Sequence, residues 1–193
     1  IKTFFKGDNS LSQRPMNRVL NPVSAMGADI TSNNGMLPIA LNKSVLEDDF
    51  VYELPVASAQ VKSCILLAGL AAQKTVTIIE PIQTRDHTAR MLKNFGANIT
   101  IAQRDSKNVI WLAGKASLKV SDYQVVGDIS AAAFLIVGAL ISQSEELEIC
   151  GVGMNPSRIG ILSVLRDMGA RIEIKNAREE SGEPIADLIV LPS

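Results

Sequence analysis

The chain has 193 residues, of which 47% are hydrophobic, 20% charged and 4% aromatic, and its formal net charge is -1. A chain of this length and composition can bury a hydrophobic core as one or two domains. The near-neutral charge and the scarcity of aromatic residues argue against a nucleic-acid surface. The longest uncharged apolar runs, 64–72 and 131–141, are shorter than the roughly 18 residues of a membrane span. We therefore expect a globular protein with no nucleic-acid and no membrane partner.

One short signature occurs three times, as AMGADIT, NFGANIT and DMGARIE, and contains Gly27, Gly96 and Gly169. Each glycine follows an apolar residue and precedes Ala-x-Ile, and the spacing between successive glycines is nearly constant. A fixed period indicates a structural unit that is built more than once. Because glycine accepts positive φ at a helix end, the signature predicts a helix that stops and a strand that follows.

The N-terminal residues are predicted to form the latter half of one such unit. Ser10 and Gln13 have the spacing of a capping box, and Pro15 falls in the first turn of a helix that ends at Gly27. The expected strands of this half unit are 2–6, 29–31 and 37–42.

The second unit is predicted to be complete, in the order βαβαββ. Ser58 is expected to cap a helix that runs to about residue 72 and is apolar almost all round, which indicates a buried helix. Thr84 is expected to cap a second helix that runs to Phe95 and carries charge on one side. The expected strands are 50–54, 75–79, 98–102 and 109–112.

The same order is predicted to return in the last third of the chain, with Asp128 as the cap of an apolar helix. Asp128 follows Ser58 by the period of the glycines, and Arg85 and Arg158 precede the glycines of their units by equal distances along the chain. These coincidences favour an α/β (α+β) fold of repeated βαβαββ units, in which small sheets cover buried helices. The expected helices are 130–141 and 157–168, and the expected strands are 123–126, 146–152, 171–174 and 187–191.

Three helix starts, within 7–18, 54–63 and 83–88, are rich in hydroxyl, amide and guanidinium groups. Free backbone N–H groups and the helix dipole favour an anion at such a position, and a phosphate is the natural candidate. Each feature also has a local explanation. Ser58 and Thr84 can be ordinary N-caps, and Arg14 and Arg85 can be surface salt-bridge residues.

Other polar residues have simpler interpretations. Gln60 is expected to be a buried amide that needs partners, and Lys62 to snorkel or to pair with a carboxylate. His87 is expected to be an exposed residue at a helix start. Cys64 and Cys150 lie in apolar stretches and lack the spacing of a metal site, so we expect buried free thiols in a reducing cytoplasm, and no bound metal.

Five longer stretches resemble one enzyme family in the correct order along the whole chain. They are GDNSLSQRPMNRVLNP, LPVASAQVKSCILLAGL, TRDHTARMLKNFGA, VVGDISAAAFLIVGAL and MNPSRIGILSVLRDMGA. They are similar to the 3-phosphoshikimate 1-carboxyvinyltransferases (EPSP synthases), and especially to the bacterial class noted for glyphosate tolerance. The resemblance implies a pseudo-threefold, two-domain fold and transfer of the enolpyruvyl group of phosphoenolpyruvate to the 5-hydroxyl of shikimate 3-phosphate. It also implies no cofactor, and glyphosate as a candidate inhibitor.

The same resemblance assigns binding roles to five residues. Ser58, Ala59 through its backbone, and Gln60 fall at the shikimate 3-phosphate site, and Arg85 joins them. Arg14 falls on the arginine that binds phosphoenolpyruvate, and Gln60 is expected to reach both ligands.

The resemblance further implies that this chain is an internal fragment of a longer enzyme. Residues 1–125 would belong to the first domain and 126–193 to the second, with a hinge near 125–127. The acid–base residues of the family are expected outside this stretch, so no catalytic residue is assigned and the isolated chain is expected to be inactive. The full enzyme is expected to be a monomer, whereas the fragment could self-associate through hydrophobic surface.

Two alternatives stay open. One is a related enolpyruvyltransferase that acts on UDP-N-acetylglucosamine and usually has a reactive cysteine on a mobile loop. The other is a non-catalytic binding module of the same repeat fold, for which the charge and aromatic content give no support.

Overall fold

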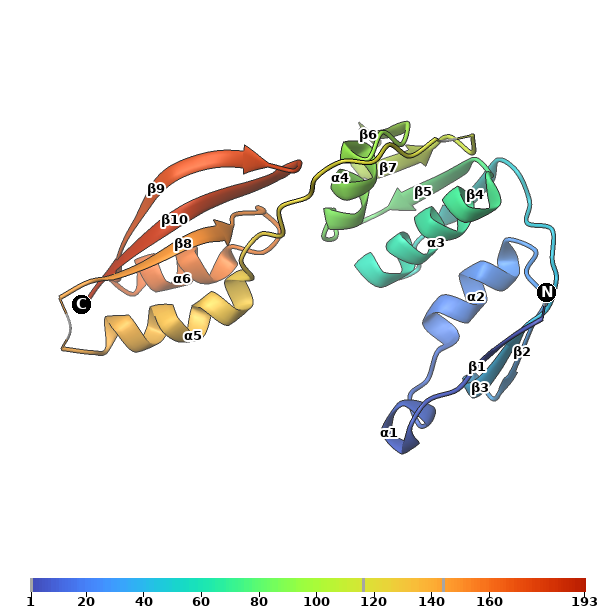
Figure 1. Ribbon diagram of the computed structural model, residues 1–193, viewed down its shortest axis with the longest axis horizontal. Coiled ribbons are helices and arrows are strands. Elements are labelled where there is room, and N and C mark those ends of the chain that lie inside the picture. The colour runs from blue at the N-terminus through green and yellow to red at the C-terminus, as the bar shows by residue number, and fades with distance from the viewer. Residues whose placement is uncertain (1, 116, 144) are drawn as a thin grey trace. The chain divides into compact units, whose positions relative to one another are not determined.

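The computed structural model describes residues 2–115, 117–143 and 145–193 and contains two compact units (Figure 1). The first compact unit comprises Ile1–Thr84 and Gly96–Lys119, and the second compact unit comprises Arg85–Phe95 and Val120–Ser193. These compact units are not the same as the repeat units predicted from the sequence. Helix α4, His87–Asn94, therefore belongs to the second unit. Within the described ranges, no helix combines the length and hydropathy that crossing a membrane requires.

The N-terminal half unit contains an antiparallel sheet with the strand order β1-β3-β2. Its hairpin turns at Asn34 and Gly35, both of which have positive φ, as the Asn-Gly sequence predicts. Helix α2, Asn17–Ala25, stops before Gly27, whose φ of +98° confirms the predicted helix end. The three strands are Thr3–Phe5, Met36–Leu41 and Ile30–Asn33.

The predicted start of this helix is wrong. A separate short helix, α1 (Asn9–Ser12), comes first, and its N-cap is Asp8, whose carboxylate accepts a hydrogen bond from the Leu11 amide at 2.7 Å. The capping box of Ser10 and Gln13 is therefore not formed. Pro15 lies between the two helices, because the residue before a proline is sterically disfavoured in the helical conformation.

The second sheet has the order β4-β5-β7-β6, in which β4 and β5 are parallel and the other pairs antiparallel. Helix α3, Ala59–Ala72, contacts β5 and β7 and lies along this sheet in Figure 1. One side of α3 is buried, but Leu67 is 48% exposed, so the expectation of burial all round is wrong for this chain. The strands are Phe50–Glu53, Val76–Glu80, Lys107–Leu112 and Ile99–Arg104.

The predicted cap of α4 is also wrong. The helix begins at His87, and the preceding Asp86 occupies the N-cap position without a side-chain cap hydrogen bond. The Thr84 hydroxyl donates to the Glu80 carboxylate instead. A threonine hydroxyl can either donate to a buried carboxylate or accept a hydrogen bond from an amide at a helix start. The local sequence does not distinguish these two roles.

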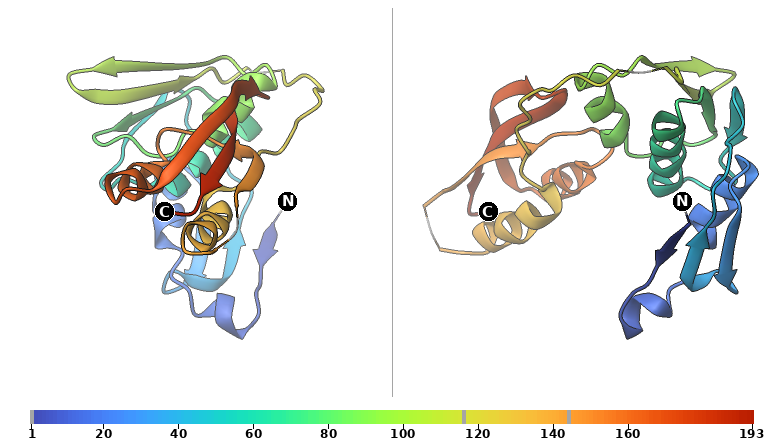
Figure 2. Two further views of the ribbon diagram at one scale, coloured as in Figure 1. Left: turned by 90° about the vertical axis from the view of Figure 1, so that its left-hand side faces the viewer. Right: turned by 45° about the vertical axis from the view of Figure 1, so that its right-hand side comes forward.

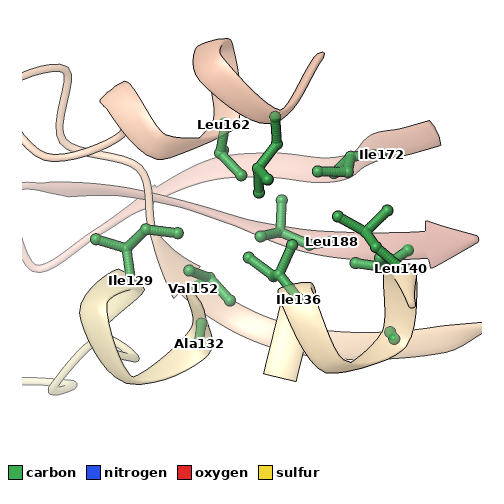
Figure 3. Close-up of a cluster of buried hydrophobic side chains, with 11 residues drawn as sticks. Ile129, Ala132, Ile136, Leu140, Val152, Leu162, Ile172 and Leu188 are labelled. Carbon is green, nitrogen blue, oxygen red and sulfur yellow. The ribbon is translucent and has the colours of Figure 1, made fainter. Parts of the chain in front are cut away.

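In the second compact unit, α5 and α6 lie on one face of the antiparallel sheet β8-β10-β9 (Figures 1 and 2). Figure 3 shows the core between them, where Ile136 of α5 and Leu162 of α6 approach Leu188 of β10. The elements of this unit besides α4 are α5 Ile129–Leu140, β8 Leu147–Gly153, α6 Gly160–Asp167, β9 Arg171–Glu180 and β10 Glu183–Leu191.

Two predictions for this region are wrong. The expected strand 123–126 is not formed, and a single parallel bridge follows it, between Gly127 and Val152. Helix α6 begins at Gly160 and not at Ser157, because the Asn155 side chain accepts hydrogen bonds from the Ser157 amide and hydroxyl and forms a turn there.

The repeat itself is confirmed by the strand topology. The orders β1-β3-β2, β5-β7-β6 and β8-β10-β9 are the same arrangement of a first strand, a central last strand and an outer middle strand. The parallel β4–β5 pair also has its counterpart in the parallel Gly127–Val152 bridge. The chain thus contains one half unit and two full units, as the glycine spacing predicts.

Candidate anion-binding site

The start of α3 presents backbone donors beside a capped turn. Ser58 has an extended conformation, with φ −144° and ψ 107°, and its hydroxyl accepts a hydrogen bond from the Val61 amide at 3.4 Å. Among the described residues, the amides of Ala59 and Gln60 donate to no acceptor. Unsatisfied amides at the positive end of a helix dipole attract anions, so this turn can bind a phosphate.

Gln60 is exposed, which corrects the expectation of a buried amide. The side of α3 that packs inward carries Val61, Ile65 and Leu66, and Gln60 lies off that side. An exposed amide at a helix start has both its donor and its acceptor available to a ligand.

Lys62 and Glu80 form a buried ion pair next to this turn. Lys62 Nζ lies 2.9 Å from Glu80 Oε1, and both side chains are 2% exposed. The same Nζ donates to the carbonyl oxygen of Thr84 at 3.3 Å. The predicted pairing of Lys62 with a carboxylate is therefore correct, and snorkelling is excluded.

A hollow of about 460 Å³ brings Arg14 and Gln60 together. The loop between α1 and α2 supplies Arg14 and Pro15, α2 supplies Arg18, and the first turn of α3 supplies Gln60. Arg14 and Arg18 are exposed, and within the described residues neither guanidinium has a hydrogen bond or an ion pair. Two free guanidinium groups and an amide at one hollow can bind a carboxylate or a phosphate.

Arg85 lies in the loop between β5 and α4, close to the start of α4, and is exposed. It belongs to the second compact unit, whereas Ser58, Ala59 and Gln60 belong to the first. Its guanidinium makes no hydrogen bond or ion pair with a described residue, so it too is free to receive an anion.

A second hollow, of about 260 Å³, lies at the start of α5 in the second compact unit. Glu183, which is 2% exposed, lies 2.8 Å from His87 Nδ1. Asn155, which is 3% exposed, donates to the Asp86 carboxylate at 2.6 Å. His87 is half-exposed, as expected, but its buried partner was not predicted from the sequence.

The Asp86 carboxylate is held by two partners. Burial by itself raises its pKa, but the hydrogen bond from Asn155 and the charge of Arg90 outweigh that effect, and the pKa lies below its ordinary value. Arg90 Nε donates to Asp86 at 2.8 Å. No local signal marks Asn155 or Glu183, because both lie far along the chain from their partners.

Arg158, to which the sequence assigns no role, is occupied by its own chain. One of its guanidinium nitrogens donates to Asp128 at 3.2 Å and to the Ser130 hydroxyl at 2.5 Å. Asp128 caps α5 as predicted and accepts a hydrogen bond from the Ser130 amide at 2.9 Å. The Ser130 amide and the Arg158 charge together lower the pKa of Asp128.

The two cysteines differ from each other. Cys64 is half-buried, and burial raises the pKa of its thiol. Cys150 is exposed, which corrects the prediction of a buried thiol, and desolvation with the charges of Glu148 and Asp187 raises its pKa. Neither environment favours a reactive thiolate. The described part of the chain contains no group of three or more potential ligands that could hold a metal ion.

Comparison with known sequences identifies one family. The profile described as EPSP synthase (3-phosphoshikimate 1-carboxyvinyltransferase) matches residues 1–189. The 3-phosphoshikimate 1-carboxyvinyltransferase of Novosphingobium aromaticivorans is 50% identical over 192 residues, which are 98% of this chain and 44% of that protein. The protein of the same name from Zymomonas mobilis is 47% identical over 98% of this chain and 42% of its own length.

Solved structures point to the same family. The EPSP synthase from Acinetobacter baumannii matches with a TM-score of 0.86 and 42% identity, over 100% of this chain and 43% of that one. The enolpyruvyl transferase NikO from Streptomyces tendae matches with a TM-score of 0.70, over 95% of this chain and 43% of that one. NikO is 16% identical, so that likeness concerns the fold alone. The chain therefore spans less than half the length of these relatives.

Proposed function

This chain belongs to the EPSP synthase family, and from that premise we propose that its protein transfers the enolpyruvyl group of phosphoenolpyruvate to the 5-hydroxyl of shikimate 3-phosphate. The observation that carries the proposal is the presence of free anion-binding groups at the start of α3 and at the hollow beside it. Both substrates are phosphates, and each phosphate group carries up to two negative charges near neutral pH. These residues bind and orient the substrates, so that the reacting groups meet in a fixed geometry.

For shikimate 3-phosphate, we propose a site formed by the Ser58 hydroxyl, the Ala59 amide, the Gln60 side chain and the Arg85 guanidinium. The helix start contributes partial positive charge and directed N–H donors, and the guanidinium adds a full charge with two parallel donors. The free state of the Arg85 side chain supports this role.

For phosphoenolpyruvate, we propose that Arg14 and Gln60 bind at the hollow of about 460 Å³. Gln60 borders both this hollow and the first turn of α3, so one amide can contact both substrates. Glyphosate carries a carboxylate and a phosphonate, and we infer that it competes for the same hollow.

We also propose that the proton-transfer groups of the reaction lie outside this chain. The proposed sites consist of a hydroxyl, a backbone amide, an amide side chain and two guanidinium groups, and this set contains no carboxylate or imidazole that could act as a general acid or base. The chain is then a substrate-binding part of a cytoplasmic enzyme that acts as a monomer. Residues 1–125 and 126–193 belong to successive domains in this proposal, with a hinge near 125–127.

The raised pKa values of the two thiols disfavour the alternative reaction on UDP-N-acetylglucosamine, because that alternative needs a reactive cysteine. The net charge of -1 likewise gives no support for a nucleic-acid-binding module.

The proposal is tested by titrating the ¹⁵N-labelled chain with shikimate 3-phosphate and with phosphoenolpyruvate. Shifts should be confined to the α3 start, Arg85 and Arg14. Arg85→Ala should weaken shikimate 3-phosphate binding by about 10- to 100-fold, because a charge-assisted hydrogen bond contributes about 1.5–3 kcal/mol. Arg14→Ala should weaken phosphoenolpyruvate binding instead.

Arg104→Ala is the matched control, because Arg104 ends the exposed strand β6 and should leave both affinities unchanged. Shifts of the same residues by UDP-N-acetylglucosamine, with none from shikimate 3-phosphate, would reject the proposed substrate. Steady phosphate release from both substrates by the purified chain would contradict the assignment of acid–base groups to other parts of the protein.

A further inference from the structure

The buried pair of Lys62 and Glu80 has no direct part in the proposed binding sites. Both side chains are only 2% exposed, so neither is open to a ligand. Their opposite charges also cancel locally. Removing two charges from water is costly, and replacing a buried pair with apolar residues is often neutral or stabilising. A gain in folding stability therefore does not by itself explain why this position holds an ion pair.

The geometry of the pair connects two segments of the first compact unit. Lys62 lies one helical turn after Ser58, and its amide donates to the Ser58 carbonyl at 3.1 Å. Its Nζ reaches the Thr84 carbonyl oxygen at 3.3 Å, and the Thr84 hydroxyl donates to Glu80. Thr84 is thereby held at both its backbone and its side chain, beside the first turn of α3.

These contacts anchor a loop that is otherwise exposed. Residues 81–83 are exposed, with Ile82 at 69%. Among the described residues, Thr84 makes all the hydrogen bonds of 81–85. The next residue is Arg85, so whatever holds Thr84 also determines where the Arg85 backbone begins.

We propose that Lys62 and Glu80 are positioning residues, which fix Thr84 and with it the peptide bond from which Arg85 begins. The inference rests on the proposed shikimate 3-phosphate site. A guanidinium binds a phosphate well only when it is preorganised, because ordering the backbone of one residue on binding costs about tenfold in affinity. The pair removes that cost before the substrate arrives.

The decisive variant replaces both charges, as Lys62→Met with Glu80→Leu, so that no unpaired charge is left buried. Its urea midpoint, followed by the fluorescence of Trp111, should stay close to that of the wild type. Its affinity for shikimate 3-phosphate in calorimetry should fall about tenfold. Lys74→Met is the control, because Lys74 follows the other end of α3 and its 3.8 Å pair with Asp48 is partly exposed.

A double variant that is folded and binds like the wild type would overturn the proposal, because a purely structural pair predicts that result. If the double variant does not fold, a comparison of Thr84→Val with Thr84→Ser tests the proposal instead. The valine removes the hydroxyl and should lower the affinity severalfold, whereas the serine should restore it. Equal affinities for the two would also overturn the proposal.

Failure of the proposed function has a different signature. If the wild type binds no shikimate 3-phosphate, the substrate is wrong, but the positioning can still be measured by amide hydrogen exchange and ¹⁵N relaxation. In the double variant, the amides of Thr84 and Arg85 should become mobile while those of Val76 and Ile78 stay protected. Unchanged order at Thr84 and Arg85 would reject the positioning role by itself.

Discussion

The starts of α3 and α5 occupy the same place in successive repeats, yet only one of them is open to an anion. Ser58 and Asp128 are both N-caps, one in each full unit. Asp128 pairs with Arg158, whereas Arg85, at the equivalent position, has no partner among the described residues. An acidic cap thus supplies the anion from within the chain, and a neutral cap leaves the helix start and the arginine available to a ligand.

The scaffolds behind the two helix starts are alike. Leu66 of α3 and Ile136 of α5 occupy equivalent positions in the repeat, and both are fully buried. Strands β5-β7-β6 and β8-β10-β9 have the same order, although only the first of these sheets has a further parallel strand, β4, at its edge. The difference in pairing therefore depends on a few side chains at the helix starts, while the fold is shared.

The largest effects are expected in the shared cores. Leu66→Ala and Ile136→Ala should each lower the free energy of unfolding by about 2–5 kcal/mol, because each removes a buried side chain and leaves a cavity. Urea titration would measure both changes in unfolding free energy. The fluorescence of Trp111 would report on the first compact unit, and hydrogen exchange would report on the second compact unit. Leu67→Ala and Phe134→Ala, at 48% and 83% exposed positions, should cost less than about 1 kcal/mol. A large difference between the two core variants would show that the units are not equivalent.

The comparison predicts that Ser58→Asp makes the start of α3 resemble that of α5, where an acidic cap takes the place of an external anion. Aspartate caps helices as well as serine does, so the stability should change little. The carboxylate should repel the substrate phosphate and occupy the free donors, lowering the affinity for shikimate 3-phosphate by about 100-fold, or about 2.7 kcal/mol. Ser58→Thr, which keeps the hydroxyl and a neutral cap, is the control. Wild-type affinity in Ser58→Asp would contradict the role of the cap.

A moderate effect is expected in acid. The folded-state pKa of Asp86 lies below the ordinary value of 3.8, so the folded protein binds fewer protons there than the unfolded chain. Its stabilising contribution is present above about pH 4 and is lost as the pH falls through the folded-state value. The difference in urea midpoint between the wild type and Asp86→Asn should therefore be largest near neutral pH and shrink below about pH 4. A constant difference across this range would be inconsistent with the lowered pKa.

The smallest effect is expected at the start of α5, where Asp128 pairs with Arg158. Arg158 and Asp128 are 23% and 61% exposed in their side chains, and a pair of this kind contributes up to about 1 kcal/mol. Arg158→Ala should lower stability by no more than that, and a double-mutant cycle with Asp128→Ser would measure the coupling. Asp128→Ser keeps a cap and removes the charge that pairs with Arg158, so it should also create weak binding of inorganic phosphate in the second compact unit. Loss of shikimate 3-phosphate binding in Arg158→Ala would contradict the distinction between the two arginines.

Sequence reasoning succeeded where a local pattern has one physical solution. A glycine after an apolar helix end accepts positive φ, so Gly27, Gly96 and Gly169 could be predicted directly as helix stops. Asp128 and Ser58 precede long apolar helices and were correctly predicted as caps. The spacing then indicated the repeat and, through it, the βαβαββ order of elements along the chain, whereas the order of strands within each sheet was not predicted.

The same reasoning failed where a polar residue has several possible partners. Thr84 matched a helix cap but satisfies Glu80, and Ser10 matched a capping box although Asp8 caps the helix. Gln60 was expected to be buried because its helix is apolar, yet exposure depends on which side of the helix meets the sheet. These outcomes are decided by distant groups, so a short window of sequence cannot resolve them.

For this protein, the sequence by itself determined the period, the helix ends and the residue types at each helix start, because backbone conformation and capping depend on neighbours in the chain. The tertiary structure alone decided which of those residues are free. It pairs Arg158 with Asp128 and Lys62 with Glu80, and it brings Arg14 and Gln60 to one hollow. Burial, pairing and shared hollows depend on segments that are distant along the chain, which come together only when the sheets and helices pack.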